Sequence, residues 1–263
     1  MFGITPSARL RPSPFYEATL KEGVTAFTTY NHMLMPTSFG HPEEEYWRLL
    51  NGVSQWDVAC ERQVQLRGPD AGRLAQILSP RDLSGCKVGQ GKYVPLCNHA
   101  GILMNDPILL KLEQDRYWLS IADSNIWFWA RAIAAERGLN VEVSEPDVSP
   151  LAVQGPKAED VVASIFGDWV RSLKYFWFQT QPSAGFPSWW RDPAGRNRAA
   201  SNFISRMGPR GRSFGTSSRR RARVGILGPA ILIFVSVWKA AYCPMGVIPM
   251  RQPIPLKCGW TNT

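Results

Sequence analysis

One carboxylate in the sequence is placed where it could act on a ligand. Asp106 follows a turn that contains Gly101, and Pro107 restricts it to an extended conformation at the start of an apolar segment, residues 108–112. A carboxylate at the mouth of a sheet can stabilise positive charge that develops on a bound molecule during a reaction. The structural alternative is an aspartate that only begins a strand.

The common motifs of several enzyme classes do not occur in the sequence. There is no G-x-G-x-x-G, no Walker loop, no G-x-S-x-G and no H-E-x-x-H. The five cysteines are odd in number and none forms a C-x-x-C pair, so neither a disulfide framework nor a metal site is expected. We therefore expect a reduced, cytoplasmic protein, and the N-terminus shows no apolar secretory leader.

A helix is predicted over residues 42–51. Pro42 and the three glutamates that follow it favour a helix start, where the macrodipole stabilises acidic side chains. Gly52 would end this helix. Its buried stripe would be Tyr46, Leu49 and Leu50.

The following elements predict a mixed fold. Residues 63–67 alternate apolar and polar side chains, the pattern of a half-buried strand. Asp70 can cap a short helix, and Asp123 or Ser124 a longer helix that Gly138 ends. The remaining predicted elements are a hairpin of residues 108–112 and 117–121, a strand at 141–143 and a helix over 156–166. Strands and helices mix without a βαβ repeat, so the predicted fold class is α+β.

Charge divides the chain into two parts. Residues 1–180 hold 17 Lys and Arg against 20 acids, a net charge of −3. Residues 181–263 hold 13 Lys and Arg and a single acid, Asp192, a net charge of +12. With 44 % hydrophobic residues, the chain has the composition of a globular protein. We expect a folded region over residues 1–178 and a basic tail of a different kind over residues 179–263.

Six motifs in the first region resemble one family, the folate-dependent aminomethyltransferases, which include the glycine-cleavage T-protein. They keep the family's order and spacing over residues 9–178, and within the family they look most like the dimethylsulfoniopropionate demethylases. The motifs are Tyr30-Asn31-His32-Met33-Leu34-Met35-Pro36, Trp56-Asp57-Val58-Ala59-Cys60-Glu61-Arg62, Ser79-Pro80-Arg81-Asp82-Leu83, Gly101-Ile102-Leu103-Met104-Asn105-Asp106, Ser120-Ile121-Ala122-Asp123-Ser124 and Leu151-Ala152-Val153-Gln154-Gly155-Pro156. The resemblance implies the N-terminal folate-binding domain of the aminomethyltransferase fold, with an incomplete second half.

The resemblance implies roles for four residues. Asp106 matches the family's carboxylate beside the folate, and Tyr93 has the family's spacing for an aromatic ring that contacts folate. Asn105 stands where many T-proteins have an acid, and we expect it to shape the site rather than to react. Asp106 is thus the predicted catalytic residue, and Tyr93, Asn105 and Asp106 the predicted tetrahydrofolate contacts. Tyr30 is the candidate substrate contact, with packing on the core as the alternative.

The implied reaction moves a methyl group from a small sulfonium, such as dimethylsulfoniopropionate, to tetrahydrofolate. The leaving group is a neutral thioether, so orientation and electrostatics matter more than acid–base work. Aromatic faces bind such cations, and the candidates are Trp127, Trp129, Tyr175 and Trp177. One alternative is the aminomethyltransferase of glycine cleavage, with a lipoyl-protein as partner. It is disfavoured by Ala59-Cys60-Glu61, which replaces the usual Ser-His-Met. Another is a non-catalytic folate-binding relative.

The basic tail has three interpretations. Residues 219–223 could contact phosphates. Residues 224–238 are mostly apolar, but a run of about 15 residues is shorter than the roughly 20 that span a membrane. The third interpretation is a change of reading frame. Read one base back, the codons from Trp189 onward permit a sequence that resembles the family's next stretch, which ends in the glutamate that binds the pterin. We favour this third interpretation, and so expect no nucleic acid and no membrane as partners and little turnover by the chain as written.

Overall fold

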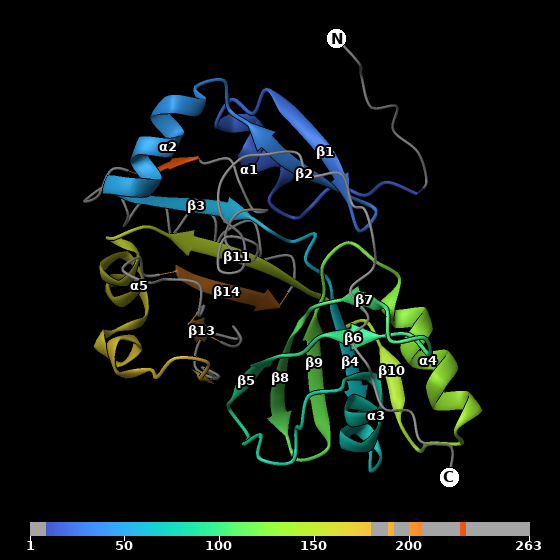
Figure 1. Ribbon diagram of the computed structural model, residues 1–263. Helices are drawn as coiled ribbons and strands as arrows, with labels where there is room; N and C mark the ends of the chain where they lie inside the picture. The colour runs from blue at the N-terminus through green and yellow to red at the C-terminus, as the bar shows by residue number, and fades with distance from the viewer. Residues whose placement is uncertain (1–8, 180–188, 192–199, 207–226, 230–263) are drawn as a thin grey trace. The chain divides into compact units, whose positions relative to one another are not determined.

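The structure is a computed structural model that describes residues 9–179, 189–191, 200–206 and 227–229 (Figure 1). It divides the chain into two units. Among the described residues, the first unit takes residues 9–61 and those from 147 onward, and the second takes residues 62–146. The chain thus leaves the first unit after Glu61 and returns to it at Asp147. Three short strands are described beyond residue 179. The rest of the basic tail lies outside the described residues, and the predicted change of reading frame stays a prediction.

The first unit contains a hairpin and a six-stranded sheet. The hairpin pairs β1 (Ala26–Tyr30) with β2 (Met33–Ser38). The sheet has the order β12-β13-β14-β11-β3-β15, in which β15 runs parallel to β3 and the other neighbours are antiparallel. The other elements are α1 (Tyr16–Lys21), α2 (Pro42–Asn51), β3 (Val53–Asp57), β11 (Val148–Gln154), α5 (Ala158–Phe166), the 3₁₀ helix η1 (Asp168–Ser172), β12 (Phe178–Gln179), β13 (Trp189–Arg191), β14 (Ala200–Arg206) and β15 (Leu227–Pro229).

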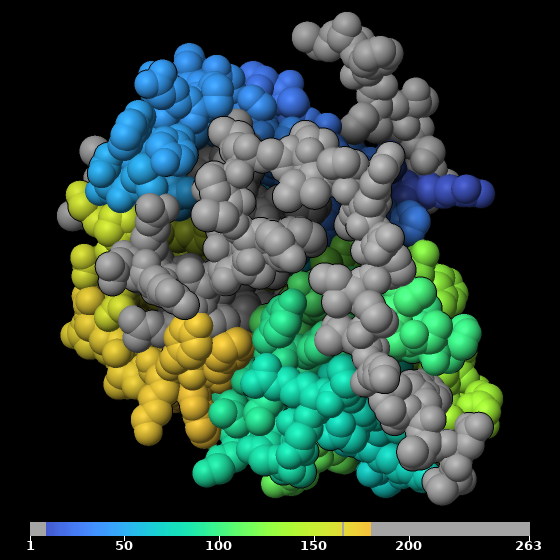
Figure 2. All heavy atoms as spheres, in the orientation of Figure 1, coloured from blue at the N-terminus to red at the C-terminus, as the bar shows by residue number. Residues whose placement is uncertain are grey.

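The predicted helix over residues 42–51 is confirmed, but its buried face differs from the prediction. Tyr46 is 47 % exposed, whereas Glu45 is only 2 % exposed. Figure 2 shows α2 in light blue at the surface. The Glu45 carboxylate turns inward because its Oε1 accepts the backbone N–H groups of Phe39 and His41, each at 3.3 Å. These amides precede the helix, and the carboxylate satisfies them.

A close backbone approach joins the end of α2 to the start of α5. Gly155 has φ +123°, and a Cβ at this position would lie 2.4 Å from the carbonyl oxygen of Gly52. The same oxygen accepts the N–H of Lys157 at 3.1 Å. Only glycine allows both this φ value and this distance.

The second unit is built on a five-stranded antiparallel sheet in the order β10-β4-β9-β8-β5. The predicted hairpin of residues 108–121 is confirmed as β8 (Ile108–Glu113) and β9 (Arg116–Ser120). The other elements are β4 (Gln63–Arg67), α3 (Ala71–Leu78), β5 (Gly91–Tyr93), β6 (Leu96–Cys97), β7 (Leu103–Asn105), α4 (Ile126–Glu136) and β10 (Glu142–Ser144). Separate helices on antiparallel sheets confirm the α+β class.

The prediction of a half-buried strand at residues 63–67 is wrong in one respect. Val64 and Leu66 face α3 and α4 in the core, as expected. Gln63 and Gln65 on the opposite face are also buried, at 1 % and 8 % exposure. Their amides are accommodated because polar groups on the neighbouring strands bond to them. Gln63 Nε2 donates to Ser120 Oγ, Gln65 Nε2 donates to Ser144 Oγ, and Gln65 Oε1 accepts from Arg116 Nε and Trp118 Nε1.

The predicted helix caps are also corrected. Asp70 precedes α3 but makes no cap hydrogen bond, because its Oδ2 accepts the N–H of Asn140 at 2.8 Å. Asn125, and not Asp123 or Ser124, is the residue before α4. Ser124 instead accepts a hydrogen bond from Asn105.

Candidate functional site

Two of the predicted site residues meet in the second unit. Tyr93 ends the edge strand β5, and Asp106 lies between β7 and β8. The register of β5 on β8 pairs Tyr93 with Ile108, so the tyrosine side chain reaches the residues just before β8. Its hydroxyl donates a 2.7 Å hydrogen bond to Oδ2 of Asp106. Tyr93 is 37 % exposed and Asp106 is half-buried, so the pair remains open to a ligand.

The phenol of this pair is held in its protonated form. Burial raises the pKa of Tyr93 well above its ordinary value, and the hydrogen bond to Asp106 and the charge of that carboxylate raise it further. The phenol is therefore the donor of this hydrogen bond and Asp106 its acceptor. The carboxylate keeps its second oxygen for a cation or a hydrogen-bond donor.

Asn105 lies beside the pair, but its side chain points into the protein. It is 5 % exposed, and its Nδ2 donates to Ser124 Oγ at 2.8 Å and to the Ala122 carbonyl oxygen at 3.3 Å. Its Oδ1 accepts the N–H of Ala122 at 3.2 Å. These bonds fasten the end of β7 to the segment before α4, and so fix the backbone from which Asp106 projects. The arrangement suits the expected shaping role.

Apolar side chains flank Asp106 on the N-terminal side. Ile102, Leu103 and Met104 are exposed and precede the Asn105–Asp106 pair directly. The Tyr93 ring, bonded to Asp106 through its hydroxyl, is a further partly exposed apolar group near the carboxylate. The sequence alone indicated no separate role for Leu103 and Met104, because apolar residues in a strand are commonly core residues.

Tyr30, the candidate substrate contact, belongs to the first unit. It ends β1 before a two-residue turn in which Asn31 and His32 have φ values of 47° and 61°. Asn31 Nδ2 donates to the Cys60 carbonyl oxygen at 2.9 Å and anchors this turn. Tyr30 itself is largely buried. The structure therefore brings Tyr93, Asn105 and Asp106 together in one unit and places Tyr30 in the other.

Asp57 is a second unusual carboxyl group, also in the first unit. It is buried at the end of β3, where it accepts hydrogen bonds from the hydroxyl of Ser13 and from the N–H of Ala59, the latter at 3.1 Å. Burial raises its pKa to about 6, although both hydrogen bonds act in the opposite direction. The group thus changes charge near neutral pH while it holds the N-terminal segment.

Two of the four aromatic candidates for cation binding belong to a core. Trp127 and Trp129 are partly buried and pack against the apolar cluster of the second unit. The guanidinium of Arg131 also lies over the Trp127 ring, 4.7 Å from its centroid. Tyr175 is exposed in the first unit and Trp177 is partly buried there.

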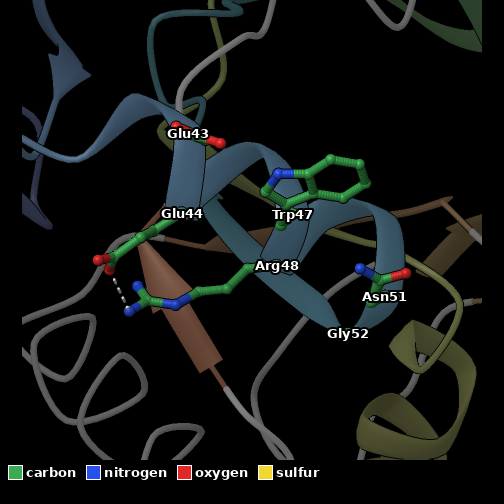
Figure 3. A pocket seen from close by; sticks show the side chains of 6 residues that line it. All are labelled: Glu43, Glu44, Trp47, Arg48, Asn51 and Gly52. Carbon is green, nitrogen blue, oxygen red and sulfur yellow. Dashed lines mark ion pairs between the residues drawn. The ribbon is translucent and has the colours of Figure 1, made fainter.

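A cavity of about 430 Å³ lies on α2, and none of the predicted site residues lines it (Figure 3). Its walls are Glu43, Glu44, Trp47, Arg48, Asn51 and Gly52. Glu44 and Arg48 form an ion pair of 3.5 Å, one turn apart. This exposed ion pair contributes about 0.3–0.5 kcal/mol at most to stability, and it does not by itself indicate a binding site. Among the described residues no group of three potential metal ligands occurs, and no helix has the length and apolar character that crossing a membrane requires.

The family model described as the GCVT N-terminal domain matches residues 15–190, so the chain belongs to this family. The fold agrees with that of the glycine cleavage system aminomethyltransferase T from Bartonella henselae, with a TM-score of 0.71 at 21 % identity over 84 % of this chain and 59 % of that one.

Among the curated relatives, the chain is 48 % identical over 176 residues to dimethylsulfoniopropionate demethylase DmdA of Ruegeria pomeroyi. This alignment covers 67 % of the chain and 48 % of the relative. An aminomethyltransferase of Symbiobacterium thermophilum is 30 % identical over 159 residues, 58 % of the chain and 42 % of the relative. The chain spans about half the length of the curated relatives it matches. The resemblance stated from the six motifs is confirmed at the level of the family.

Proposed function

We propose that the protein is a tetrahydrofolate-dependent methyl transferase that demethylates a small sulfonium such as dimethylsulfoniopropionate. The observation that carries the proposal is the half-buried Asp106 carboxylate with the phenol of Tyr93 bonded to it. The identity of 48 % to a dimethylsulfoniopropionate demethylase supports the choice of substrate.

The residues at this site fit a reduced folate. The exposed apolar side chains before Asn105 suit a flat ring, and Asp106 suits a ring nitrogen that becomes positively charged. Tetrahydrofolate supplies the nucleophilic nitrogen when it is bound. Asp106 would stabilise the positive charge that arises as the methyl carbon bonds to that nitrogen and the electrons of the carbon–sulfur bond pass to sulfur, which leaves as the neutral thioether. The proton of the methylated nitrogen would then pass to water, which gives the neutral 5-methyl product. Tyr93 would keep the carboxylate oriented, and the leaving group itself needs no proton.

The second candidate function is aminomethyl transfer in glycine cleavage. It is favoured by the identity of 30 % to an aminomethyltransferase and would require a lipoyl-protein partner. For both candidate functions we propose that the protein acts in the cytoplasm. The free thiols of Cys60, Cys86 and Cys97 are consistent with this location. A methyl donor of small size is the proposed partner in the first case.

The nature of the folate product separates the candidates. The gene is re-read across the codons for residues 175–205, and the protein it encodes is incubated with tetrahydrofolate and dimethylsulfoniopropionate. Formation of 5-methyl-tetrahydrofolate, lost in Asp106→Ala, supports the proposal. Formation of the methylene product and ammonia from an aminomethylated lipoyl-protein supports the second candidate. Folate binding without either product identifies a non-catalytic relative and contradicts both.

A further inference from the structure

The side chain of Arg81 reaches the backbone of Tyr93. Arg81 lies in the loop of residues 79–83 after α3, and its Nη1 donates a 2.8 Å hydrogen bond to the Tyr93 carbonyl oxygen. The donor carries a positive charge, so this bond is stronger than one between neutral groups. It acts on the residue whose hydroxyl holds Asp106.

The Tyr93 carbonyl needs such a partner because β5 is an edge strand. Before and after Tyr93, two residues bond to the chain of β8 and the residue before it. The Gln90 carbonyl accepts from the Lys111 N–H at 3.1 Å, and the Val94 N–H donates to the Pro107 carbonyl at 2.9 Å. Residues along an antiparallel strand alternate between facing the neighbour and facing away. The polar backbone groups of Tyr93 therefore point to the outer edge of the sheet, where Arg81 meets the carbonyl.

The loop that carries Arg81 is itself fixed by one side chain of α3. Gln76 Nε2 donates to the carbonyl oxygens of Arg81 at 2.9 Å and of Ser79 at 3.3 Å. Gln76 Oε1 accepts the N–H of Leu83 at 2.9 Å. The N–H of Arg81 also donates to Ser79 Oγ at 3.2 Å. Arg81 thus starts from a rigid backbone, and its contact transmits that rigidity to Tyr93.

We propose that Arg81 is a positioning residue, which fixes the backbone of Tyr93 so that its hydroxyl stays bonded to Asp106. The inference rests on the proposed function only where it treats the Tyr93–Asp106 pair as the folate contact. Arg81 is exposed and makes no ion pair among the described residues. Substitution of Arg81 therefore loosens the Tyr93–Asp106 pair and removes no side chain from the hydrophobic core.

The first test follows the Tyr93 hydroxyl without any folate. The full chain is labelled with 3-fluorotyrosine, and the ¹⁹F resonance of Tyr93 among the seven tyrosines is assigned with Tyr93→Phe. In Arg81→Gln we expect the pKa of the labelled phenol to fall by about one pH unit, a tenfold change in acidity. Removal of a positive charge alone would raise this pKa, so a fall reports the loosened bond to Asp106. An unchanged or raised pKa overturns the proposal.

The second test measures tetrahydrofolate affinity on the same proteins. Arg81→Gln should bind about tenfold more weakly, which corresponds to about 1.4 kcal/mol. Arg81→Lys keeps a cationic donor and should lie in between. Arg73→Gln is the matched control, since Arg73 is exposed on α3 and makes no hydrogen bond or ion pair within the described part of the chain.

The two measurements separate failure of the inference from failure of the proposed function. A fall in the phenol pKa in a protein that does not bind tetrahydrofolate contradicts the proposed function and leaves the role of Arg81 standing. If the wild type binds tetrahydrofolate and Arg81→Gln binds it with equal affinity, the proposal that Arg81 positions the ligand site is overturned. If Arg81→Gln does not fold, Arg81→Lys carries both measurements, and an unchanged pKa and affinity there overturn the proposal.

Discussion

The hydroxyl of Tyr93 at the end of the edge strand β5 and the carboxylate of Asp106 in the short link between β7 and β8 are joined by a 2.7 Å hydrogen bond. The two residues are thirteen positions apart, and the pairing of β5 with β8 brings them together. Neither side chain is fully buried. The bond therefore orders a surface that a ligand can reach.

Tyr93→Phe removes the donor of this bond and keeps the ring. We expect tetrahydrofolate affinity to fall about tenfold, because Asp106 loses its fixed orientation, a cost of about 1.4 kcal/mol. The free energy of unfolding should change little, since the site is partly exposed. Fluorescence titration with tetrahydrofolate measures the affinity, with exposed Tyr175→Phe as the control. Equal binding by Tyr93→Phe and the wild type would show that the bond does not serve the ligand.

Asn105→Asp places a carboxylate where an amide now donates to two oxygens. The new oxygen would face the Ala122 carbonyl and Ser124 Oγ. We expect the free energy of unfolding to fall by about 2–4 kcal/mol at pH 7. The loss should be smaller at pH 4, where a protonated carboxyl group can donate one hydrogen bond. Urea unfolding at both pH values measures it.

Asn98→Asp is the control for that substitution. Asn98 uses only its Oδ1, which accepts the N–H groups of Ala100 and Ile102 at 2.9 and 3.0 Å. A carboxylate can accept both bonds, so stability should change by less than about 0.5 kcal/mol. Equal losses from the two substitutions would contradict the importance of the Asn105 donor.

Gly155→Ala should be strongly destabilising. The new Cβ would lie 2.4 Å from the Gly52 carbonyl oxygen, and the φ of +123° is unfavourable for alanine. We expect a loss of at least about 3 kcal/mol from the two effects combined. Gly85→Ala has open space around its Cβ and no positive φ, and should be close to neutral in the same thermal or urea unfolding experiment. A Gly155→Ala protein as stable as Gly85→Ala would refute the close approach of α2 and α5.

Asp57 makes stability depend on pH. Its pKa rises from 3.8 to about 6 in the folded protein, so the fold favours the protonated form. The contribution of the neutral carboxyl group is fully present below pH 3.8 and is lost as the pH rises through about 6. The whole effect is about 3 kcal/mol at most, from about two pH units at roughly 1.4 kcal/mol each.

The measurement for Asp57 is the unfolding free energy between pH 4 and pH 7. Asp57→Asn should flatten its decline across this window, because the amide stays neutral. Asp115→Asn, in a tight turn of the second unit, is the control and should leave the slope unchanged. An identical slope in Asp57→Asn and the wild type would exclude Asp57 as its source.

Local signals predicted the bounds of several elements well. Pro42 and Gly52 mark the ends of α2, and residues 108–121 form the predicted hairpin. The faces of these elements were harder to predict. Glu45 is buried because amides outside its helix require an acceptor, and Gln65 because polar groups on other strands bond to it. Such partners are distant in sequence, so periodicity does not reveal them.

The candidate site was predicted by resemblance more than by pattern. Asp106 and Tyr93 were singled out, but their hydrogen bond depends on the register of β5 and β8. Arg81 was part of a quoted motif and received no role, because a side chain that binds a backbone carbonyl leaves no periodic signal. Gln76 contacts the same loop because α3 ends directly before it. This contact could be predicted only if the end of α3 was known.

The glutamines of β4 disfavour a one-residue slip of this strand in the sheet of the second unit. Val64 and Leu66 face the helices, and Gln63 and Gln65 face the polar side chains of the neighbouring strands. A slip of one residue would turn both amides toward the apolar helices, and each unsatisfied amide would cost about 1–3 kcal/mol. A one-residue misalignment of β4 is therefore penalised twice, once on each face of the sheet.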